Sequence, residues 1–307
     1  MDTILVVGIE SVAGANIAAT LQDSSSIVGI SAVPGIQVDG CRIHQGGGTI
    51  EQQINAIGPD RIIFCGNSSR STWDNSDTRR AGFDDSLAVD WANAAGAARI
   101  EFTMISSDAI FTGPWMSHAE DDAHFCETPQ AERLRQIESE VLCSHSRALV
   151  VRCNTFGWSP NTEAPGFAES MLSDLETGGR TSIPFLCHSG PILATELALM
   201  LSQAHVAGLS GFLHLGSAER INPFQFAERL AESAGTQPPQ FPNGTTLHTP
   251  VEGFGSGETM LNCRRASTLL GVRLPLISDS IDAFLAQADN GFRAMLRSDV
   301  GELSRVA

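Results

Sequence analysis

A run of polar side chains ends a predicted buried strand in the first half of the chain. Residues 99–107 are rich in apolar and β-branched side chains, which is typical of a strand, and the loop that follows turns at Gly113. The strand ends on Ser106 and Ser107, and Asp108 comes next. In an open α/β sheet, such a strand end delivers polar side chains to the ligand crevice. We therefore predict that Ser106, Ser107 and Asp108 line a ligand site, with Ser106 at a cofactor and Asp108 at the substrate.

A glycine-rich turn near the amino terminus is typical of dinucleotide binding. It lies between an apolar strand at residues 4–8 and a helix at residues 16–21, which is the context that this motif requires. Ser11 stands where a glycine normally lets the backbone approach a pyrophosphate, and Glu10 adds negative charge where the helix N-terminus attracts phosphate. A βα turn kept for packing alone is the alternative. The residues predicted to hold the cofactor here are Gly8, Ser11, Val12 and Gly14.

The second strand, predicted at residues 26–33, does not end on the acid that binds the adenosine ribose in many dinucleotide sites. That acid is expected about 20 residues past the glycines, but the strand end offers only Ala, Val, Pro and Gly. Arg42 can instead meet the 2′-phosphate of NADP, although a lone arginine is more often a solvated charge. A further strand at residues 58–66 leads into Gly66 and Asn67, which we expect to line the cofactor. The expected cofactor is NADP or NAD, with Arg42 leaning towards NADP.

Two histidines and three carboxylates lie close together at residues 118–124. They are His118, Glu120, Asp121, Asp122 and His124. Their spacing matches no specific metal-ligand pattern, and Cys126 just beyond mixes a soft ligand with hard ones. A solvated acidic loop is the simpler interpretation, so we predict no metal here.

The bulk composition restricts the function classes. A chain of 307 residues with 42% hydrophobic and 18% charged residues can bury a large core. Its formal net charge of -16 opposes a broad nucleic-acid or anionic-membrane surface. The sequence shows neither a leader pattern nor an apolar run of membrane length. Seven scattered cysteines without a CxxC pair suggest free thiols in a reducing compartment, so we expect a cytoplasmic protein.

The elements that must position these residues alternate along the chain. Strands and helices follow one another as in an α/β fold with a Rossmann-type doubly wound parallel sheet. We expect this dinucleotide-binding domain at residues 1–157, with residues 190–217 returning to it. Residues 158–189 and 218–307 then form a smaller C-terminal substrate-binding lobe. In that lobe, Asn222 and Pro223 predict a helix start, and residues 277–296 predict one final amphipathic helix.

Several segments resemble the dTDP-4-dehydrorhamnose reductases, which are extended short-chain dehydrogenases. The stretch ISSDAIFTG at residues 105–113 is similar to the family's ISTDYVFDG, and VVRCNTFGWSP at residues 150–160 is similar to RTNIFGW. LNCRRASTLLGVRLP at residues 261–275 resembles LDSSKARRLLGIRLP. The family reduces a nucleotide-sugar ketone with a nicotinamide cofactor. The resemblance implies substrate contacts at Asn154, Arg264 and Arg265, although both arginines can equally be solvent-facing.

The resemblance also shows what this chain lacks. In the family a Ser or Thr at the strand end works with a Tyr, and with a Lys four residues later on the following helix. Ser107 matches the first position, and matching the helix through Ile137 and Glu140 places Glu132 at the Tyr and Gln136 at the Lys. The chain contains no Tyr, and all of its 19 basic residues are arginines. The family's Tyr–Lys pair therefore cannot be assembled, which leaves Ser107, Glu132 and Gln136 as the catalytic candidates.

A ketone reductase must protonate the developing alkoxide as hydride arrives. Glu132 with an ordinary pKa of about 4.3 is ionised near neutrality and cannot donate that proton. We therefore expect a non-catalytic or regulatory protein that binds a nucleotide sugar, NAD(P) or another small molecule. Two alternatives stay open: an oxidoreductase or epimerase-like enzyme with a substitute acid (Glu132, Asp108, His118 or His124), and an active reductase of a 4-keto nucleotide sugar. A partner protein and a homodimer also stay open.

Overall fold

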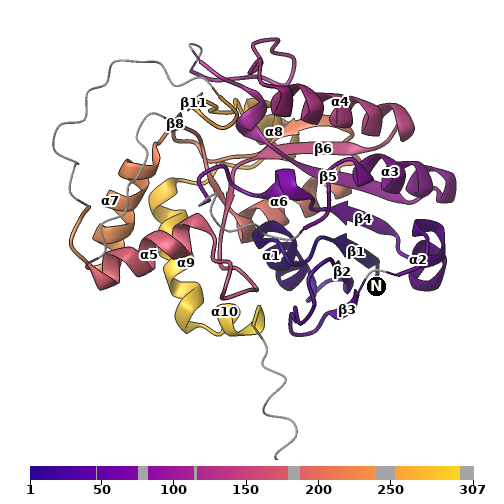
Figure 1. The fold of residues 1–307 in the computed structure, drawn as a ribbon, viewed down its shortest axis with the longest axis horizontal. Helices are drawn as coiled ribbons and strands as arrows, with labels where there is room; N and C mark the ends of the chain where they lie inside the picture. Colours follow the sequence, from indigo (N-terminus) through magenta and orange to yellow (C-terminus); the bar gives the residue numbers. More distant parts are fainter. Residues whose placement is uncertain (46, 75–81, 114–115, 179–186, 240–252, 298–307) are drawn as a thin grey trace, which may run out of the picture.

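The computed structural model of the chain describes residues 1–45, 47–74, 82–113, 116–178, 187–239 and 253–297. Their main sheet has seven strands in the order β10-β6-β5-β4-β1-β2-β3, and all neighbouring strands are parallel (Figure 1). The order runs outward in both directions from β1 and β4, which confirms the predicted doubly wound fold. The strands are β1 (Thr3–Val7), β2 (Ser26–Ser31), β3 (Arg42–Gln45), β4 (Arg61–Phe64), β5 (Glu101–Ser107), β6 (Leu149–Cys153) and β10 (Gly211–His214).

Helices cover both faces of this sheet, so its strands are buried on two sides. Successive residues of β1 alternate between two cores, with Ile4 and Val6 in one and Leu5 and Val7 in the other. The first core includes α1 (Val12–Leu21) and α6 (Ala194–Val206), which lie against each other. The second includes α2 (Ile50–Ile57), α3 (Leu87–Ala98) and α4 (Pro129–Ser144).

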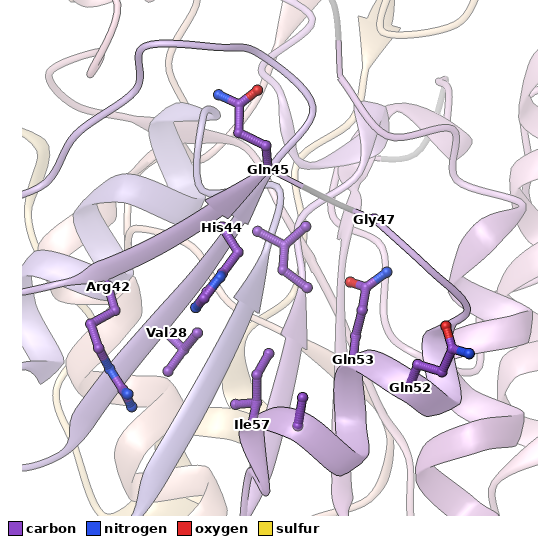
Figure 2. A pocket seen from close by; sticks show the side chains of 10 residues that line it. Val28, Arg42, His44, Gln45, Gly47, Gln52, Gln53 and Ile57 are labelled. Atoms are coloured by element: carbon purple, nitrogen blue, oxygen red, sulfur yellow. The ribbon is translucent and has the colours of Figure 1, made fainter.

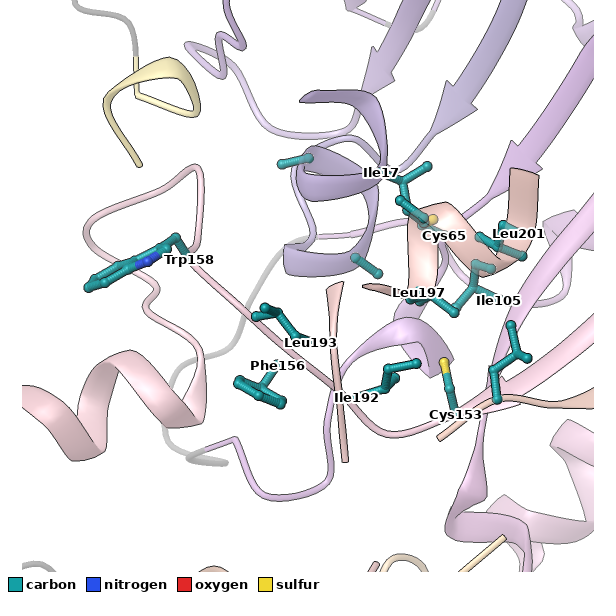
Figure 3. Packing of buried hydrophobic residues seen from close by; sticks show 14 of the residues in the cluster. Ile17, Cys65, Ile105, Cys153, Phe156, Trp158, Ile192, Leu193, Leu197 and Leu201 are labelled. Atoms are coloured by element: carbon teal, nitrogen blue, oxygen red, sulfur yellow. The ribbon is translucent and has the colours of Figure 1, made fainter. Parts of the chain in front are cut away.

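A smaller group of helices lies beside the sheet, on the left of Figure 1. It consists of α5 (Phe167–Thr177), α7 (Pro223–Ala234), α9 (Ile277–Asp289) and α10 (Phe292–Met295). Aromatic rings hold this group to the chain that leaves β6: the Phe156 ring lies 5.1 Å from that of Phe226 and 6.0 Å from that of Phe284. Figure 3 shows Phe156 beside Leu193 at the edge of the aliphatic cluster, with Trp158 further out. The domain boundary at residues 157 and 158 stays a prediction.

Short elements complete the fold. Two parallel pairs join β7 (Thr155–Phe156) to β9 (Ile192–Leu193) and β8 (Cys187–His188) to β11 (Gly257–Glu258). α8 (Arg264–Leu270) contacts β10, and single turns form η1 (Asn67–Ser69) and η2 (Asp108–Ile110).

One sequence prediction needed correction, one strand was missed and one helix start was confirmed. Residues 277–296 do not form one helix, because the chain breaks at Gly291, which has a φ of +89° that favours glycine. The edge strand β3 was not predicted, because its residues are mostly exposed and polar and show no apolar alternation. The helix start at Asn222 is confirmed: its side chain accepts from the Gln225 N–H in a capping box, and Pro223 is the first helical residue.

Two simple properties of the chain bear on its environment. In the described parts, no helix is both long enough and apolar enough to cross a bilayer. All seven cysteines carry free thiols, and five of them are buried: Cys65, Cys126, Cys153, Cys187 and Cys263. Their burial follows from the apolar segments that carry them, as expected of structural cysteines.

Candidate functional site

The glycine-rich turn has the backbone geometry that its sequence predicts. Gly8 has a φ of +86°, and a Cβ atom there would lie 1.9 Å from the carbonyl oxygen of Cys65. A Cβ on Gly14 would lie 2.3 Å from the Gly8 oxygen. Both glycines are therefore required so that the turn and α1 can approach the ends of β1 and β4.

Ser11 takes part in holding this turn together. It is the N-cap of α1, and its hydroxyl accepts from the Gly14 N–H at 2.9 Å while it donates to the Gly8 oxygen at 2.8 Å. One N–H of the first helical turn is thus already used inside the protein. The N–H groups of Val12 and Ala13 also lie in this first turn, where no helical carbonyl precedes them as a partner. They remain the natural donors for a phosphate at this turn.

Glu10 lies buried between the ends of two strands. Its side chain is 8% exposed, and burial raises the pKa of its carboxyl group, opposed by the nearby Ser31 hydroxyl, the Ala32 backbone and the Arg70 charge. Its Oε2 atom is buried with no hydrogen-bond partner among the described residues. The sequence marked Glu10 only as an unfavourable charge, because burial at the end of β2 depends on contacts that the local pattern does not contain.

Arg42 lies away from the carboxyl edge of the sheet. In the pairing of β3 with β2, Arg42 is level with Val28, whereas Gln45 is level with Ser31 at the strand end. Three residues of strand correspond to about 10 Å. Arg42 is exposed and lines a cavity of about 440 Å³ between β3 and α2, where Figure 2 shows it on the far side of His44 from Gln45. The expectation that Arg42 meets a 2′-phosphate at the strand ends therefore has no support in the fold.

The end of β4 is a polar turn held by Asp85. Gly66 begins η1, and a Cβ atom there would lie 2.5 Å from Asp85 Oδ1. Both the N–H and the hydroxyl of Ser68 donate to the same oxygen, at 2.9 and 2.8 Å. Burial raises the pKa of Asp85. Asn67 is exposed beside this turn, so of the two predicted cofactor contacts Gly66 shapes the backbone and Asn67 presents a side chain to solvent.

Ser106 is engaged in a buried ion pair. Its hydroxyl donates to Glu138 Oε1 at 2.6 Å, and both carboxylate oxygens of Glu138 accept from Arg152, at 3.1 and 2.7 Å. Glu138 and Arg152 are 0% and 2% exposed. Arg152 also stacks over the Phe212 ring at 4.1 Å and approaches His214, whose pKa is lowered to about 3 by burial and by the Arg152 charge. This ion pair is structural, and it occupies the hydroxyl that the sequence assigned to the cofactor.

The helix after the strand does not present the expected catalytic pair. Glu132 and Gln136 lie on the exposed face of α4, and Gln136 donates to Glu140 at 2.8 Å. The buried face carries Ala131, Leu134, Ile137, Glu138 and Val141. The acid that faces the strand is therefore Glu138, not Glu140. Leu134 lies one helical turn before Glu138, and Gln130 lies two turns before it. If Glu138 instead of Glu140 is matched to the family's acid, Leu134 takes the position of the lysine and Gln130 that of the tyrosine.

Ser107 and Asp108 lie in the interior at the end of β5. Ser107 is 2% exposed, and its hydroxyl accepts from the Ala109 N–H at 3.1 Å as the cap of η2. Asp108 is 1% exposed, and its Oδ2 atom accepts from the hydroxyls of Ser189 at 2.5 Å and Thr259 at 2.7 Å. Burial raises the pKa of Asp108 to about 6, against the opposing effect of these hydroxyls. A carboxyl group of this kind can exchange protons near neutral pH.

Asn154 belongs to the same polar cluster. Its Oδ1 atom accepts from the Ser71 hydroxyl at 2.6 Å, and the nearby Asn154 side chain opposes the rise in the Asp108 pKa. The Oδ1 atom of Asp108 and the Nδ2 atom of Asn154 have no partner within hydrogen-bond distance among the described residues. The structure thus brings together two residues predicted to contact the substrate. It also adds Ser71, Ser189 and Thr259 to the cluster. The sequence did not predict them, because a single serine or threonine in a loop carries no recognisable pattern.

The remaining predicted residues lie elsewhere. Arg264 and Arg265 are exposed at the start of α8, and Arg265 donates to the carbonyl of Phe212 in β10. His118 is buried and stacks on Phe111 at 4.6 Å, whereas His124 is exposed and pairs with Asp122 at 2.7 Å. Burial lowers the pKa of His118. Within the described ranges, no three His, Cys, Asp or Glu side chains are grouped so as to hold a metal ion.

Comparison with known proteins places this geometry in a family. A family model described as the RmlD substrate binding domain matches residues 1–290. Among curated proteins, none matches the sequence significantly.

Solved structures share the fold at low sequence identity. A dTDP-4-dehydrorhamnose reductase from Bacillus anthracis in complex with NADP is 16% identical, with a TM-score of 0.73. The match covers 93% of this chain and 99% of the reductase chain. The Bordetella bronchiseptica enzyme WbmH in complex with NAD+ is 14% identical with a TM-score of 0.69, and the match covers 95% of this chain and 100% of that one. A UDP-glucuronic acid 4-epimerase from Bacillus cereus, in complex with UDP-glucuronic acid and NAD, is 13% identical with a TM-score of 0.71 over 92% and 98% of the chains.

Proposed function

The chain belongs to the family of the RmlD substrate binding domain, and on this premise we propose that it binds a nicotinamide dinucleotide and a nucleotide sugar without the family's reductase chemistry. Its role is then sensing or regulation, in the cytoplasm, through a partner protein or a second copy of the chain. Fold alone does not fix activity, which depends on the residues that the site contains.

The observation that carries the proposal is the face that α4 turns towards the sheet. Reduction of a ketone needs a proton donor beside the nicotinamide. On α4 the buried acid is Glu138, which is held by Arg152 and Ser106, and Leu134 lies one turn before it. Both oxygens of the Glu138 carboxylate already accept hydrogen bonds from Arg152, and Oε1 also accepts from Ser106, so this acid is engaged in a buried ion pair. Glu132 points to solvent instead.

Other features support retained binding. Gly8 and Gly14 keep a turn that only glycine allows, and the Val12 and Ala13 N–H groups lie in the first turn of α1, where no helical carbonyl precedes them. The related structures named above hold NADP, NAD+ or NAD, and the epimerase also holds UDP-glucuronic acid. These complexes favour a dinucleotide and a nucleotide sugar as the ligand classes for this fold.

Two measurements on the full chain test the proposal. Calorimetric titration with NADH and NADPH should show saturable binding of at least one of them. A steady-state assay with the same cofactor and dTDP-4-dehydrorhamnose should show no turnover above a protein-free control. Turnover at an ordinary enzymatic rate, about 1 s⁻¹ or more, would overturn the proposal that the protein is non-catalytic. Absence of binding at millimolar cofactor would overturn the proposal that it binds a dinucleotide.

A substitute-acid oxidoreductase is the second candidate, and Asp108 is the observation that favours it. Its carboxyl group follows Ser107 directly, and its pKa of about 6 lies near the value that a general acid needs. If this candidate holds, turnover falls as pH rises through about 6, and Asp108→Asn reduces it by about 10²–10⁴. Glu132→Gln on the exposed face is the matched control, and an equal loss in both variants would remove Asp108 from consideration.

A further inference from the structure

Glu10 lies where a ligand crevice forms in folds of this type. It lies in the turn after β1, three residues past Val7, and the strand order diverges between β1 and β4. In open α/β sheets ligands bind outside the carboxyl ends of the strands at such a point. Two hydrogen bonds, from the N–H groups of Gly8 and Ile9 to the carbonyl of Ile30, hold the turn against the end of β2. The turn therefore carries the Glu10 carboxylate to the end of the second strand.

The Glu10 side chain is held in this position, but one of its two carboxylate oxygens lacks a partner among the described residues. It is 8% exposed, with the Ser31 hydroxyl and the Ala32 backbone near it on the β2 side and the Arg70 charge on the β4 side. Its Oε2 atom has no hydrogen bond in the described structure. A buried carboxylate oxygen without a donor is costly, so its retention points to a donor that arrives with a ligand.

Among the described residues, the segment that follows β2 offers no other acid for that ligand. The residues from Ala32 to Gly35 contain no carboxylate. Arg42, the cation that would favour a phosphate on the ribose, is level with Val28 and about 10 Å short of the strand end. The acid that the described structure places at the carboxyl end of β2 is therefore Glu10, with the Arg70 charge near it on the β4 side.

We propose that Glu10 binds the ribose hydroxyl groups of the adenosine half of NAD and excludes the 2′-phosphate of NADP. The inference rests on the proposed dinucleotide binding and adds its selectivity. The carboxylate has the acceptor that a ribose diol needs, and it comes from the glycine turn rather than from β2. The 2′-phosphate of NADP would place further negative charge against a buried carboxylate. Repulsion between these like charges would weaken the binding of NADP relative to NAD.

Calorimetric titration with ADP-ribose and with its 2′-phosphorylated form isolates this contact from the nicotinamide. The wild-type chain should bind ADP-ribose at least about tenfold more tightly than 2′-phospho-ADP-ribose. Glu10→Gln keeps the size and an acceptor oxygen but removes the charge, so the ratio should shrink at least about fivefold, mainly through tighter binding of the phosphorylated probe.

Glu51→Gln is the matched control, because Glu51 is an exposed acid on α2 and its loss changes the net charge equally. It should leave the ratio unchanged. A third probe, 2′-deoxy-ADP-ribose, should bind more weakly than ADP-ribose to the wild type but not to Glu10→Ala. Circular dichroism checks that each variant is folded.

The outcomes separate this inference from the proposed function. Equal binding of the two main probes, preference for the phosphorylated one, or a ratio that Glu51→Gln shifts as much as Glu10→Gln overturns the role of Glu10 while dinucleotide binding stands. If neither probe binds at millimolar concentration, both the inference and the proposed binding function are overturned.

Discussion

The buried pair of Glu138 and Arg152 is the residue-scale feature that most strongly shapes this site. Its charges are compensated by three hydrogen bonds from Arg152 to the Glu138 carboxylate, by one from the Ser106 hydroxyl and by the Phe212 ring over which Arg152 stacks. It fixes the register of α4 on β6, because only one face of the helix can present Glu138 to the arginine. The pair therefore decides which residues of α4 can reach the end of β5.

Removing one partner of this pair should strongly destabilise the folded protein. Arg152→Leu leaves a buried uncompensated carboxylate, and we expect it to cost about 3–5 kcal/mol of unfolding free energy in urea titrations. Arg147→Leu is the control, because Arg147 pairs with Glu101 at 3.5 Å on the surface and such pairs contribute about 0–1 kcal/mol. Equal losses in the two variants would show that the buried pair has no special weight.

Asp108 should make stability depend on pH. Its folded pKa of about 6 exceeds the unfolded value of about 3.9, so folding favours the protonated form. The stabilisation is present in full below the unfolded pKa and is lost as pH rises through about 6. Relative to Asp108→Asn, the wild type should therefore lose about 2 kcal/mol between pH 4.5 and 7.

Urea titrations of both proteins across this pH range measure the effect, since the other titrating groups cancel in the difference. A constant difference between wild type and Asp108→Asn over the whole range would contradict a raised pKa. A difference that grows in favour of the wild type with rising pH would mean that the pKa is lowered instead.

At the scale of elements, the turn between β1 and α1 is fixed by steric contact rather than by propensity. Gly14 lies where any side chain would strike the Gly8 carbonyl oxygen, at 2.3 Å from Cβ. Ser11 is accepted because its position has an ordinary φ of -80° and a side chain that caps the helix. The turn therefore stays intact although Ser11 replaces the middle glycine of the dinucleotide-binding motif.

Gly14→Ala should be strongly destabilising, because the backbone on both sides must move to admit the methyl group. We expect a loss of about 2–3 kcal/mol in thermal or urea unfolding, in the range of overpacked core sites. Gly96→Ala in α3 is the control: its Cβ would lie 3.4 Å from the Ser144 oxygen, and alanine favours a helix interior by about 1 kcal/mol. Similar effects of the two substitutions would mean that the turn adapts.

At the scale of the whole molecule, Trp73 connects the crevice side of the sheet with the smaller group of helices. It follows η1 after β4, and its ring lies 5.2 Å from that of Phe167 in α5 and 6.3 Å from that of Phe226 in α7. Asp74 next to it accepts from the Phe167 N–H at 2.7 Å. The two parts of the molecule are thus joined by a buried aromatic contact beside the ends of the strands.

Trp73→Ala should loosen the smaller group of helices more than the sheet. We expect a loss of about 3–5 kcal/mol overall and faster amide exchange in α5 and α7 than in β1. Leu199→Ala, at a position that is 56% exposed on α6, is the control and should change neither. Uniformly faster exchange across α5, α7 and β1 would show that Trp73 stabilises one cooperative unit instead.

Much of the fold was determined by the sequence alone. The apolar runs at β1, β5 and β6, the glycines of the first turn and the Asn222 cap act locally, through hydrophobic periodicity and backbone geometry, so their positions could be predicted. The absence of Tyr and Lys is a property of composition, and no fold can change it. The family resemblance followed from the order of such segments.

The tertiary structure alone decided which polar groups meet. Glu138 rather than Glu140 is the buried acid of α4, because Arg152 lies opposite it in β6. Glu10 is buried because the turn lies against the end of β2. Asp108 meets Ser189 and Thr259, which are 81 and 151 residues away along the chain. Burial and pairing of charges depend on such distant contacts, and a local pattern of residue types does not contain them.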